Sequence, residues 1–217
     1  MASVKNNRNG VSGCRSVGAC PRTGANALEI ADTPDRRYAD TASRQRRSAG
    51  VVNLTVNGQL HALEIGKRPD QVDPAHTLAH TLRETLGLTG TKISCDHGAC
   101  GCCTVLMNGK AVLSCMTLTV ECDGKSVTTI EGLADPKTGK LDPIQQAFID
   151  ETAFQCGFCT PGIIMSTKAL LSENPSPTEE ETKEALSGNF CRCISHYHVL
   201  RAVMAASQNP LAGRGTD

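Results

Sequence analysis

Eight of the twelve cysteines in this 217-residue sequence fall into two groups with short, regular spacing. The first group follows the pattern CxxxxCxxC, with a fourth cysteine after eleven intervening residues, and its members are Cys95, Cys100, Cys103 and Cys115. Plant-type 2Fe-2S proteins space their thiolate ligands in this way. Gly98 and Gly101 lie between the first three cysteines, where the backbone must bend sharply and bring N–H groups close to the sulfurs. The spacing predicts an iron-sulfur cluster, with zinc or four buried thiols as the alternatives.

The second group consists of a CxxC pair, Cys156 and Cys159, and a CxC pair, Cys191 and Cys193. Two such pairs are compatible with zinc as well as with iron and sulfur. Each pair lies at or just before the predicted start of a helix, where the positive helix end stabilises a cluster of net negative charge. The position therefore favours a second iron-sulfur cluster, while the spacing alone leaves zinc open.

The other cysteines lack ligand spacing. Cys102 is predicted to be a small buried side chain, because its neighbour in sequence, and not Cys102, keeps the two-residue gap that a ligand needs. Cys122 is expected to be structural, and Cys14 and Cys20 to be exposed thiols. His97 lies inside the first cysteine loop, but four cysteines already fill that site, so a histidine ligand is not expected.

Composition narrows the classes of partner. Lys plus Arg equal Asp plus Glu at 22 each, so no overall charge attracts the chain to nucleic acid or to an anionic membrane. No apolar run approaches the roughly 20 residues that span a bilayer, and the first 30 residues lack the apolar block of a secretory signal. A cytoplasmic location is expected, and in a reducing cytosol clustered cysteines more often hold metal than form disulfides.

The segments that must position the first cysteine group change character near residue 50. Residues 1–50 are predicted to be a disordered basic extension, because they lack a sustained apolar period. Residues 51–134 read as a small α+β domain. Its expected elements are a hairpin around Asn57-Gly58, a helix starting after Asp73 and ending near Gly87, a second hairpin around Asn108-Gly109 and a strand over residues 126–130.

Beyond a linker rich in turn residues, Asp135 to Gly139, only helices are predicted. Caps and first-turn prolines place four of them at 142–153, 160–174, 178–188 and 193–206. The second domain is therefore expected to be an all-α four-helix unit over residues 135–208, followed by a flexible tail over residues 209–217.

The segments CDHGACGCCTV, QCGFCTPG and SGNFCRC closely resemble the signature segments of the iron-sulfur subunit of molybdenum hydroxylases. That family includes xanthine dehydrogenase, aldehyde oxidoreductase and carbon monoxide dehydrogenase. The similarity runs from about Val52 to about Ala206, and TLRETLGLTGTK and TTIEGLA also match. The resemblance implies an α+β chain with an N-terminal β-grasp 2Fe-2S ferredoxin-like domain, followed by an all-α four-helix 2Fe-2S domain.

Carried over by position, the resemblance makes the first four cysteines ligands of an outer cluster and the second four ligands of an inner cluster. It implies that Gln155 hydrogen-bonds a molybdopterin and that Cys193 also approaches the pterin edge. The sequence departs from many relatives at Cys102, where they have Ala, and over residues 194–198, where they have a Thr-Gly-Tyr-like run. The second departure affects the details expected around the pterin.

The expected function is that of a non-catalytic electron-transfer subunit in an oxidoreductase complex. The resemblance implies a large molybdopterin-binding subunit as one partner and a medium FAD-binding subunit as another. Electrons would pass from the molybdenum centre through the inner and outer clusters to FAD or another acceptor. Aldehydes, purines, other N-heterocycles, carbon monoxide and aromatic thioesters all fit as the substrate of the complex, and the wording of the first cysteine loop favours an aldehyde or an N-heterocycle. The alternatives are a free-standing two-cluster ferredoxin and a structural module that binds zinc.

Overall fold

The structure, a computed structural model, describes residues 50–193 and 196–209. The predicted extension and tail lie outside these residues, apart from residues 50 and 209 at their inner ends, and so do Cys14 and Cys20. Among the described residues, no helix is both long enough and apolar enough to cross a membrane. The described residues carry both cysteine groups.

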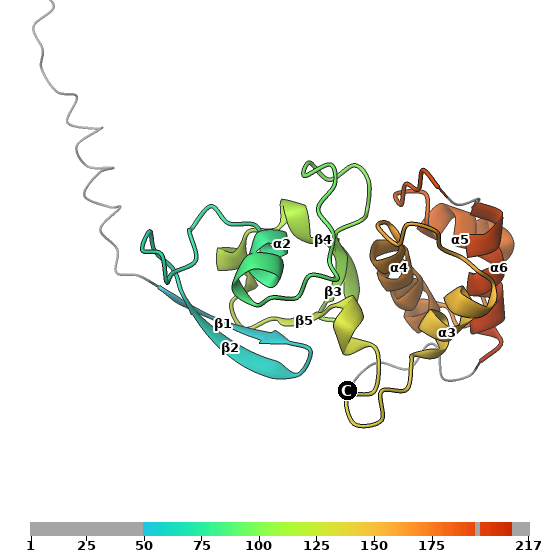
Figure 1. Cartoon of the computed structure of the whole chain (residues 1–217), viewed down its shortest axis with the longest axis horizontal. Helices are drawn as coiled ribbons and strands as arrows, with labels where there is room; N and C mark the ends of the chain where they lie inside the picture. The colour runs from blue at the N-terminus through green and yellow to red at the C-terminus, as the bar shows by residue number, and fades with distance from the viewer. Residues whose placement is uncertain (1–49, 194–195, 210–217) are drawn as a thin grey trace, which may run out of the picture. The chain divides into compact units, whose positions relative to one another are not determined.

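The first half is built on a five-stranded mixed sheet with strand order β2-β1-β5-β3-β4 (Figure 1). Strand β1 (Val51–Val56) pairs antiparallel with β2 (Gln59–Glu64). The predicted turn joins them, and Asn57 and Gly58 have φ values of 50° and 80°. Two consecutive positive φ values suit the right-handed twist of a hairpin, and Asn followed by Gly tolerates them best. The first predicted hairpin is confirmed.

The second hairpin lies between the third and fourth cysteines of the first group. Strand β3 (Thr104–Met107) begins directly after Cys103, and β4 (Lys110–Leu113) ends just before Cys115. Strand β5 (Ser126–Thr128) pairs parallel with β1 and antiparallel with β3. It ends two residues earlier than predicted because a 3-10 turn, η4 (Ile130–Gly132), follows.

The predicted helix after Asp73 starts later than expected. The helical turn α2 (Leu78–His80) is capped by Thr77 and continues as a π-helical turn, η1 (Thr81–Thr85). The Asp73 carboxylate instead accepts the N–H of Ala75 at 2.8 Å and closes a local turn. Asp favours such turns as readily as helix caps, so the predicted helix cap at Asp73 is wrong and Thr77 takes that place.

The second half contains the four predicted helices. They are α3 (Pro143–Asp150), α4 (Thr160–Glu173), α5 (Glu179–Ala185) and α6 (His196–Ser207). The predicted helix start at Asp142 and the predicted capping box at Thr178 are confirmed, and Asp142 also forms a capping box, with Gln145. Cys159 occupies the N-cap position of α4 without a capping hydrogen bond from its side chain, and Thr160, the predicted cap, is the first helical residue. Helices α3 and α5 end about three residues before the predicted ends, and α5 stops short of Gly188.

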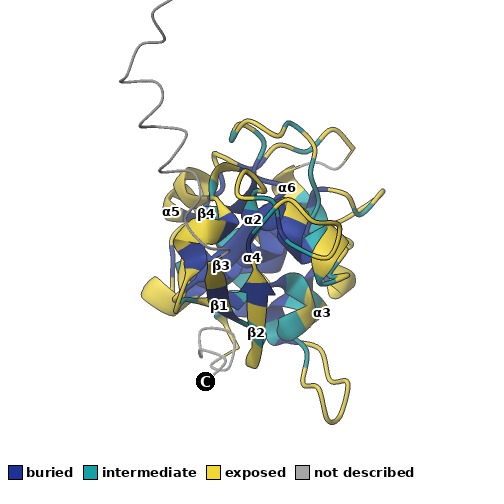
Figure 2. Cartoon of the chain, turned by 90° about the vertical axis from the view of Figure 1, so that its left-hand side faces the viewer, coloured by how far each residue is buried: buried dark blue, intermediate teal, exposed yellow. Residues whose placement is uncertain are grey.

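The interior has two main hydrophobic clusters. One lies between the sheet and the α2 turn, and the other lies among the helices. The helical cluster also includes Cys102, Leu106 and Leu133 from the first half, and α4 packs against β3. Figure 2 shows buried residues concentrated along the strands and α4, with exposed residues on the outer loops. The helical core is therefore completed by side chains of the sheet half.

A buried ion pair ties two helices of the second half together. Lys168 Nζ, on α4, lies 2.9 Å from Asp142 Oδ2, and the two side chains are only 3% and 6% exposed. The other carboxylate oxygen of Asp142 accepts the N–H of Ile144 at 2.8 Å and caps α3. Removing one partner of a buried pair leaves the other charge without compensation. Stability of the second half should therefore depend on this pair.

We expect Lys168→Met to lower the free energy of unfolding by about 3–5 kcal/mol, because Asp142 would keep a buried charge. Lys183→Met is the control, since Lys183 is half exposed and pairs with Glu179 at the surface. Urea unfolding followed by circular dichroism measures both changes. Similar small effects from the two substitutions would show that the buried pair does not stabilise the fold.

Candidate functional site

The first cysteine group lies in the loop that precedes β3 and in the 3-10 turn η2 (Ser114–Met116), which follows β4. Cys103 and Cys115 are buried, while Cys95 and Cys100 are partly exposed. The thiol of Cys95 hydrogen-bonds that of Cys100, the thiol of Cys115 hydrogen-bonds that of Cys103, and Cys95 and Cys115 interact electrostatically. Gly101 lies in the loop at a φ of 70°. The structure thus brings together the four residues that the sequence grouped.

Backbone N–H groups surround this first set of sulfurs. The N–H of His97 is the main reason that the pKa of Cys95 falls to about 6, and the N–H of Ala99 lies 3.3 Å from the same sulfur. Burial and the neighbouring Cys103 thiol raise the pKa of Cys115 to about 12, against the effect of the Gly98 N–H. The His97 ring nitrogen Nδ1 contacts the Cys95 carbonyl oxygen. The His97 ring is therefore directed to the backbone.

The second group lies at the start of α4 and before α6. Cys193 Sγ is 3.5 Å from Cys156 Sγ, and the thiol of Cys159 hydrogen-bonds that of Cys191. Burial is the main cause that raises the pKa of Cys159 to about 12, whereas the N–H of Phe158 lowers the pKa of Cys156. All four thiols line one cavity of about 350 Å³. Cys156 and Cys193 are exposed, so this site opens to the surface.

Two 2Fe-2S clusters suit these two groups by donor chemistry. Each group supplies four thiols, the ligand type and number that such a cluster needs, together with backbone N–H groups that stabilise sulfur charge. Among residues 50–193 and 196–209, no three His, Cys, Asp or Glu side chains converge closely enough to hold one metal ion. The fit rests on the grouping of the thiols and on the N–H groups beside them.

Cys102 and Cys122 are buried, as predicted for cysteines outside the ligand sets. Burial raises the pKa of both thiols, that of Cys102 to about 12. The Cys102 sulfur lies 4.0 Å from the carbonyl oxygen of Cys100 and interacts electrostatically with Cys159 of the second group. Cys102 therefore lies close to members of both cysteine groups.

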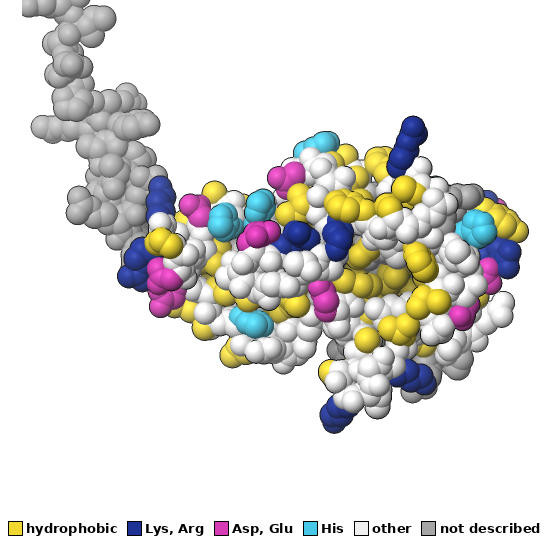
Figure 3. Space-filling view, viewed as in Figure 1, with side chains coloured by type: hydrophobic (Ala, Val, Ile, Leu, Met, Phe, Trp, Pro, Cys, Tyr) yellow, Lys and Arg dark blue, Asp and Glu magenta, His cyan; other side chains and the backbone are white. Residues whose placement is uncertain are grey.

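The sequence analysis missed an aromatic surface around the second group. Three of the four phenylalanines are exposed there, namely Phe154, Phe158 and Phe190, whereas Phe148 is buried in α3. Gln155, the predicted pterin contact, is exposed between the first two of them. Hydrophobic side chains gather over the helical half of the face in Figure 3. The available signal was the position of Phe158 and Phe190 directly before ligand cysteines, with Phe154 two residues before Cys156.

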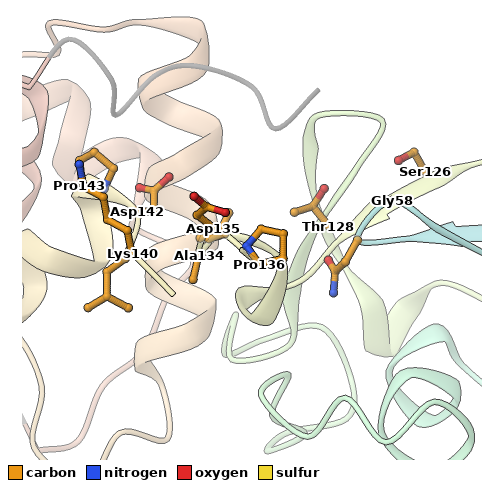
Figure 4. Close-up of a pocket in the computed structure, with 13 residues that line it drawn as sticks. Gly58, Ser126, Thr128, Ala134, Asp135, Pro136, Lys140, Asp142 and Pro143 are labelled. Carbon is orange, nitrogen blue, oxygen red and sulfur yellow. The ribbon is translucent and has the colours of Figure 1, made fainter. Parts of the chain in front are cut away.

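A cavity of about 680 Å³ lies away from both cysteine groups. It is lined by the β1-β2 turn at Gly58, by β5, and by residues of the segment from Gly132 to Pro143 (Figure 4). The charged side chains labelled there are Asp135, Lys140 and Asp142. Asp142 is already paired with Lys168 on α4. No cysteine lines this cavity, so it contributes no ligand to either cluster site.

Substitution at two adjacent cysteines tests the assignment of the first site. Cys103→Ser should destroy or weaken the outer cluster selectively, because the Cys103 thiol contacts that of Cys115. Cys102→Ala should leave both clusters in place, because the change removes only a small buried group. Iron content and electron paramagnetic resonance measure both effects. The reverse pattern would assign the ligand role to Cys102.

Two family models match the chain in tandem. One, described as "2Fe-2S iron-sulfur cluster binding domain", matches residues 68–149, and the other, "[2Fe-2S] binding domain", matches residues 129–204. Each match contains one of the two cysteine groups completely. The matches support 2Fe-2S clusters as the groups that the chain binds.

Two relatives are similar over most of this chain. The nicotine 6-hydroxylase small subunit of Paenarthrobacter nicotinovorans is 48% identical over 155 residues, which cover 71% of this chain and 88% of the relative. The aldehyde oxidoreductase iron-sulfur-binding subunit PaoA of Escherichia coli is 43% identical over 171 residues, covering 72% of this chain and 71% of the relative. Both are iron-sulfur or small subunits of larger oxidoreductases by name.

A solved structure has the same fold. It is that of quinoline 2-oxidoreductase from Pseudomonas putida 86, with a TM-score of 0.69 and 38% sequence identity. The match covers 79% of this chain and 100% of that chain. The sequence and structural similarity agree with the resemblance seen in the cysteine segments. The chain belongs to the family of iron-sulfur small subunits of the molybdenum hydroxylases.

Proposed function

We propose that this chain relays electrons from a molybdopterin centre on a large partner subunit to FAD on a medium subunit, or to another acceptor. In this proposal the inner cluster is bound by Cys156, Cys159, Cys191 and Cys193, and the outer cluster by Cys95, Cys100, Cys103 and Cys115. One observation carries the proposal: two complete four-thiol groups are joined by a direct backbone hydrogen bond, from the Phe190 N–H to the Cys100 carbonyl oxygen at 3.0 Å.

The residues of the chain have separate tasks in this relay. A bound 2Fe-2S cluster supplies a site that accepts and releases one electron. The thiolates hold each cluster, and the N–H groups of Ala99 and Phe158 offset negative charge on the sulfurs. Burial of Cys103 and Cys115 limits the access of water to one side of the outer site. The catalytic chemistry lies on the partner subunit.

Each cluster site reaches the surface at a different place. The inner site is exposed at Cys156 and Cys193, beside the exposed side chain of Gln155. At the outer site, Met116 is 61% exposed and packs close to Gly98 of the cysteine loop. A relay between two partners needs one opening toward each of them. The two openings support docking of the molybdopterin subunit at the inner site and of the acceptor subunit at the outer site.

The finer organisation is also part of the proposal. Hairpins joined into a mixed sheet under a short helical turn support a β-grasp ferredoxin-like domain over residues 51–134. The four helices support a helical 2Fe-2S domain over residues 135–208. Free thiols among the described cysteines suit a reducing cytoplasm.

Because the named relatives act on an aldehyde or N-heterocycles, we propose one of these classes as the substrate of the complex.

Metal analysis tests the core of the proposal. The anaerobically purified chain should contain about four irons and four acid-labile sulfides, because each complete four-cysteine set holds one 2Fe-2S cluster. The protein should also absorb visible light. Stoichiometric zinc without a visible chromophore would instead identify a structural zinc module. Purification with two larger chains would distinguish a complex subunit from a free-standing ferredoxin.

Gln155→Ala tests the docking of the pterin at the inner site. Both clusters should remain, but the loss of one or more hydrogen bonds of about 1 kcal/mol each should weaken pterin docking. In rapid-reaction measurements on the assembled complex, substrate should still reduce molybdenum while reduction of the clusters slows. Gln146→Ala is the matched control, because Gln146 is exposed on α3 and its side-chain amide donates to Asp150 Oδ1 at 2.8 Å. Equal reduction rates in both variants would remove Gln155 from the route.

A further inference from the structure

The two cysteine loops are joined by a pair of neighbouring hydrogen bonds. The Phe190 N–H donates to the Cys100 carbonyl oxygen at 3.0 Å, and Asn189 Nδ2 donates to the Gly101 carbonyl oxygen at 3.2 Å. Two consecutive carbonyls of the first loop are thus held by two consecutive residues of the second. Phe190 directly precedes Cys191, a proposed inner ligand, while Cys100 is a proposed outer ligand. The contact joins the two ligand sets at their backbones.

Glycines allow the backbones to approach this closely. A Cβ atom on Gly101 would lie 2.6 Å from the Gly188 carbonyl oxygen and 2.4 Å from Asn189 Nδ2. A Cβ atom on Gly162, in the first turn of α4, would lie 2.2 Å from the Gly101 carbonyl oxygen and 2.9 Å from the Cα atom of Cys102. Such distances are too short for a side chain. The first turn of α4 and both cysteine loops therefore meet with little room for adjustment.

Asn189 forms hydrogen bonds through both its backbone and its side chain. Its backbone N–H donates to the Leu186 carbonyl oxygen at 2.9 Å, which fixes it to the end of α5. Its side chain crosses to Gly101, whose carbonyl oxygen also accepts the Thr104 hydroxyl at 2.7 Å. Asn189 is only 4% exposed, so water does not readily replace its amide as a donor. The amide thus connects a fixed point of the helical half to a fixed point of the sheet half.

We propose that Asn189 is a positioning residue that fixes the separation and orientation of the two clusters. It does so by tying the loop that contains Cys191 and Cys193 to the loop that contains Cys100 and Cys103. The inference rests on the proposed function, in which each loop holds a cluster. Electron tunnelling weakens steeply with distance, so a tie between the loops sets the rate of transfer between clusters without touching either one.

The test uses the full chain with both clusters reduced. Pulsed electron paramagnetic resonance measures the magnetic coupling between the clusters, which falls with the cube of their separation. Asn189→Ala should retain both clusters but show a weaker and more broadly distributed coupling than the unmodified chain. Asn189→Ala removes a contact from this junction, whereas Gly162→Ala adds a Cβ atom that would push α4 away from Gly101. Gly162→Ala should therefore also alter the coupling.

Thr167→Val is the matched control. Thr167 is fully buried in α4 and its hydroxyl donates to the Ile163 carbonyl oxygen at 2.9 Å, so the substitution removes a buried hydrogen bond within the helix. This variant should keep the coupling of the unmodified chain. A change in Thr167→Val equal to that in Asn189→Ala would show general loosening and would overturn the positioning role.

Further outcomes decide between this inference and the proposed function. Asn189→Ala with both clusters and unchanged coupling would overturn the positioning role, and so would loss of the inner cluster, because Asn189 would then build the inner site instead. Absence of coupling in an unmodified chain that holds two clusters would also overturn it. By contrast, iron content below two clusters in the unmodified chain would contradict the proposed function itself.

Discussion

The arrangement of the cysteine loops depends on backbone N–H groups that point at sulfur. The N–H groups of His97 and Ala99 converge on Cys95, and that of Phe158 on Cys156. A loop can aim several N–H groups inward only if it turns sharply, which requires positive φ values such as those of Gly98 and Gly101. Stabilising charge on the sulfurs therefore requires sharply turning loops, and such loops require glycine at these positions. The strands and helices around the loops hold them in this conformation.

The sheet half and the helical half of the chain share one packed interior. Gly101 and Gly162 bring a cysteine loop into backbone contact with α4, and Cys102 and Leu106 complete the helical core. Close packing resists small displacements because a protein interior has few voids to absorb them. The distance between the two cysteine groups is thus a property of the packed interface and not of a connecting segment.

Local sequence signals predicted most of the helices and strands, but they did not predict contacts between residues far apart in the sequence. Asn-Gly turns and the caps at Asp142 and Thr178 act within a few residues, so they were read correctly. Asp73 was misread because its carboxylate closes a turn with Ala75, an alternative that the same residue type serves equally well. The cysteine groups followed from spacing. The bond from Asn189 to Gly101 spans 88 positions, and no local pattern announces such a contact.

The two cysteine groups differ in how they meet solvent, and the difference argues for work within a complex. Two thiols of the first group are buried in the sheet half, whereas Cys156 and Cys193 of the second are exposed beside Phe158 and Phe190. Exposed aromatic side chains clustered beside a functional group are typical of a surface that another protein covers. A free electron carrier that binds many partners briefly would leave such an aromatic surface exposed to water most of the time. A subunit gains from it, because a partner that covers the aromatic rings also excludes water from the inner site.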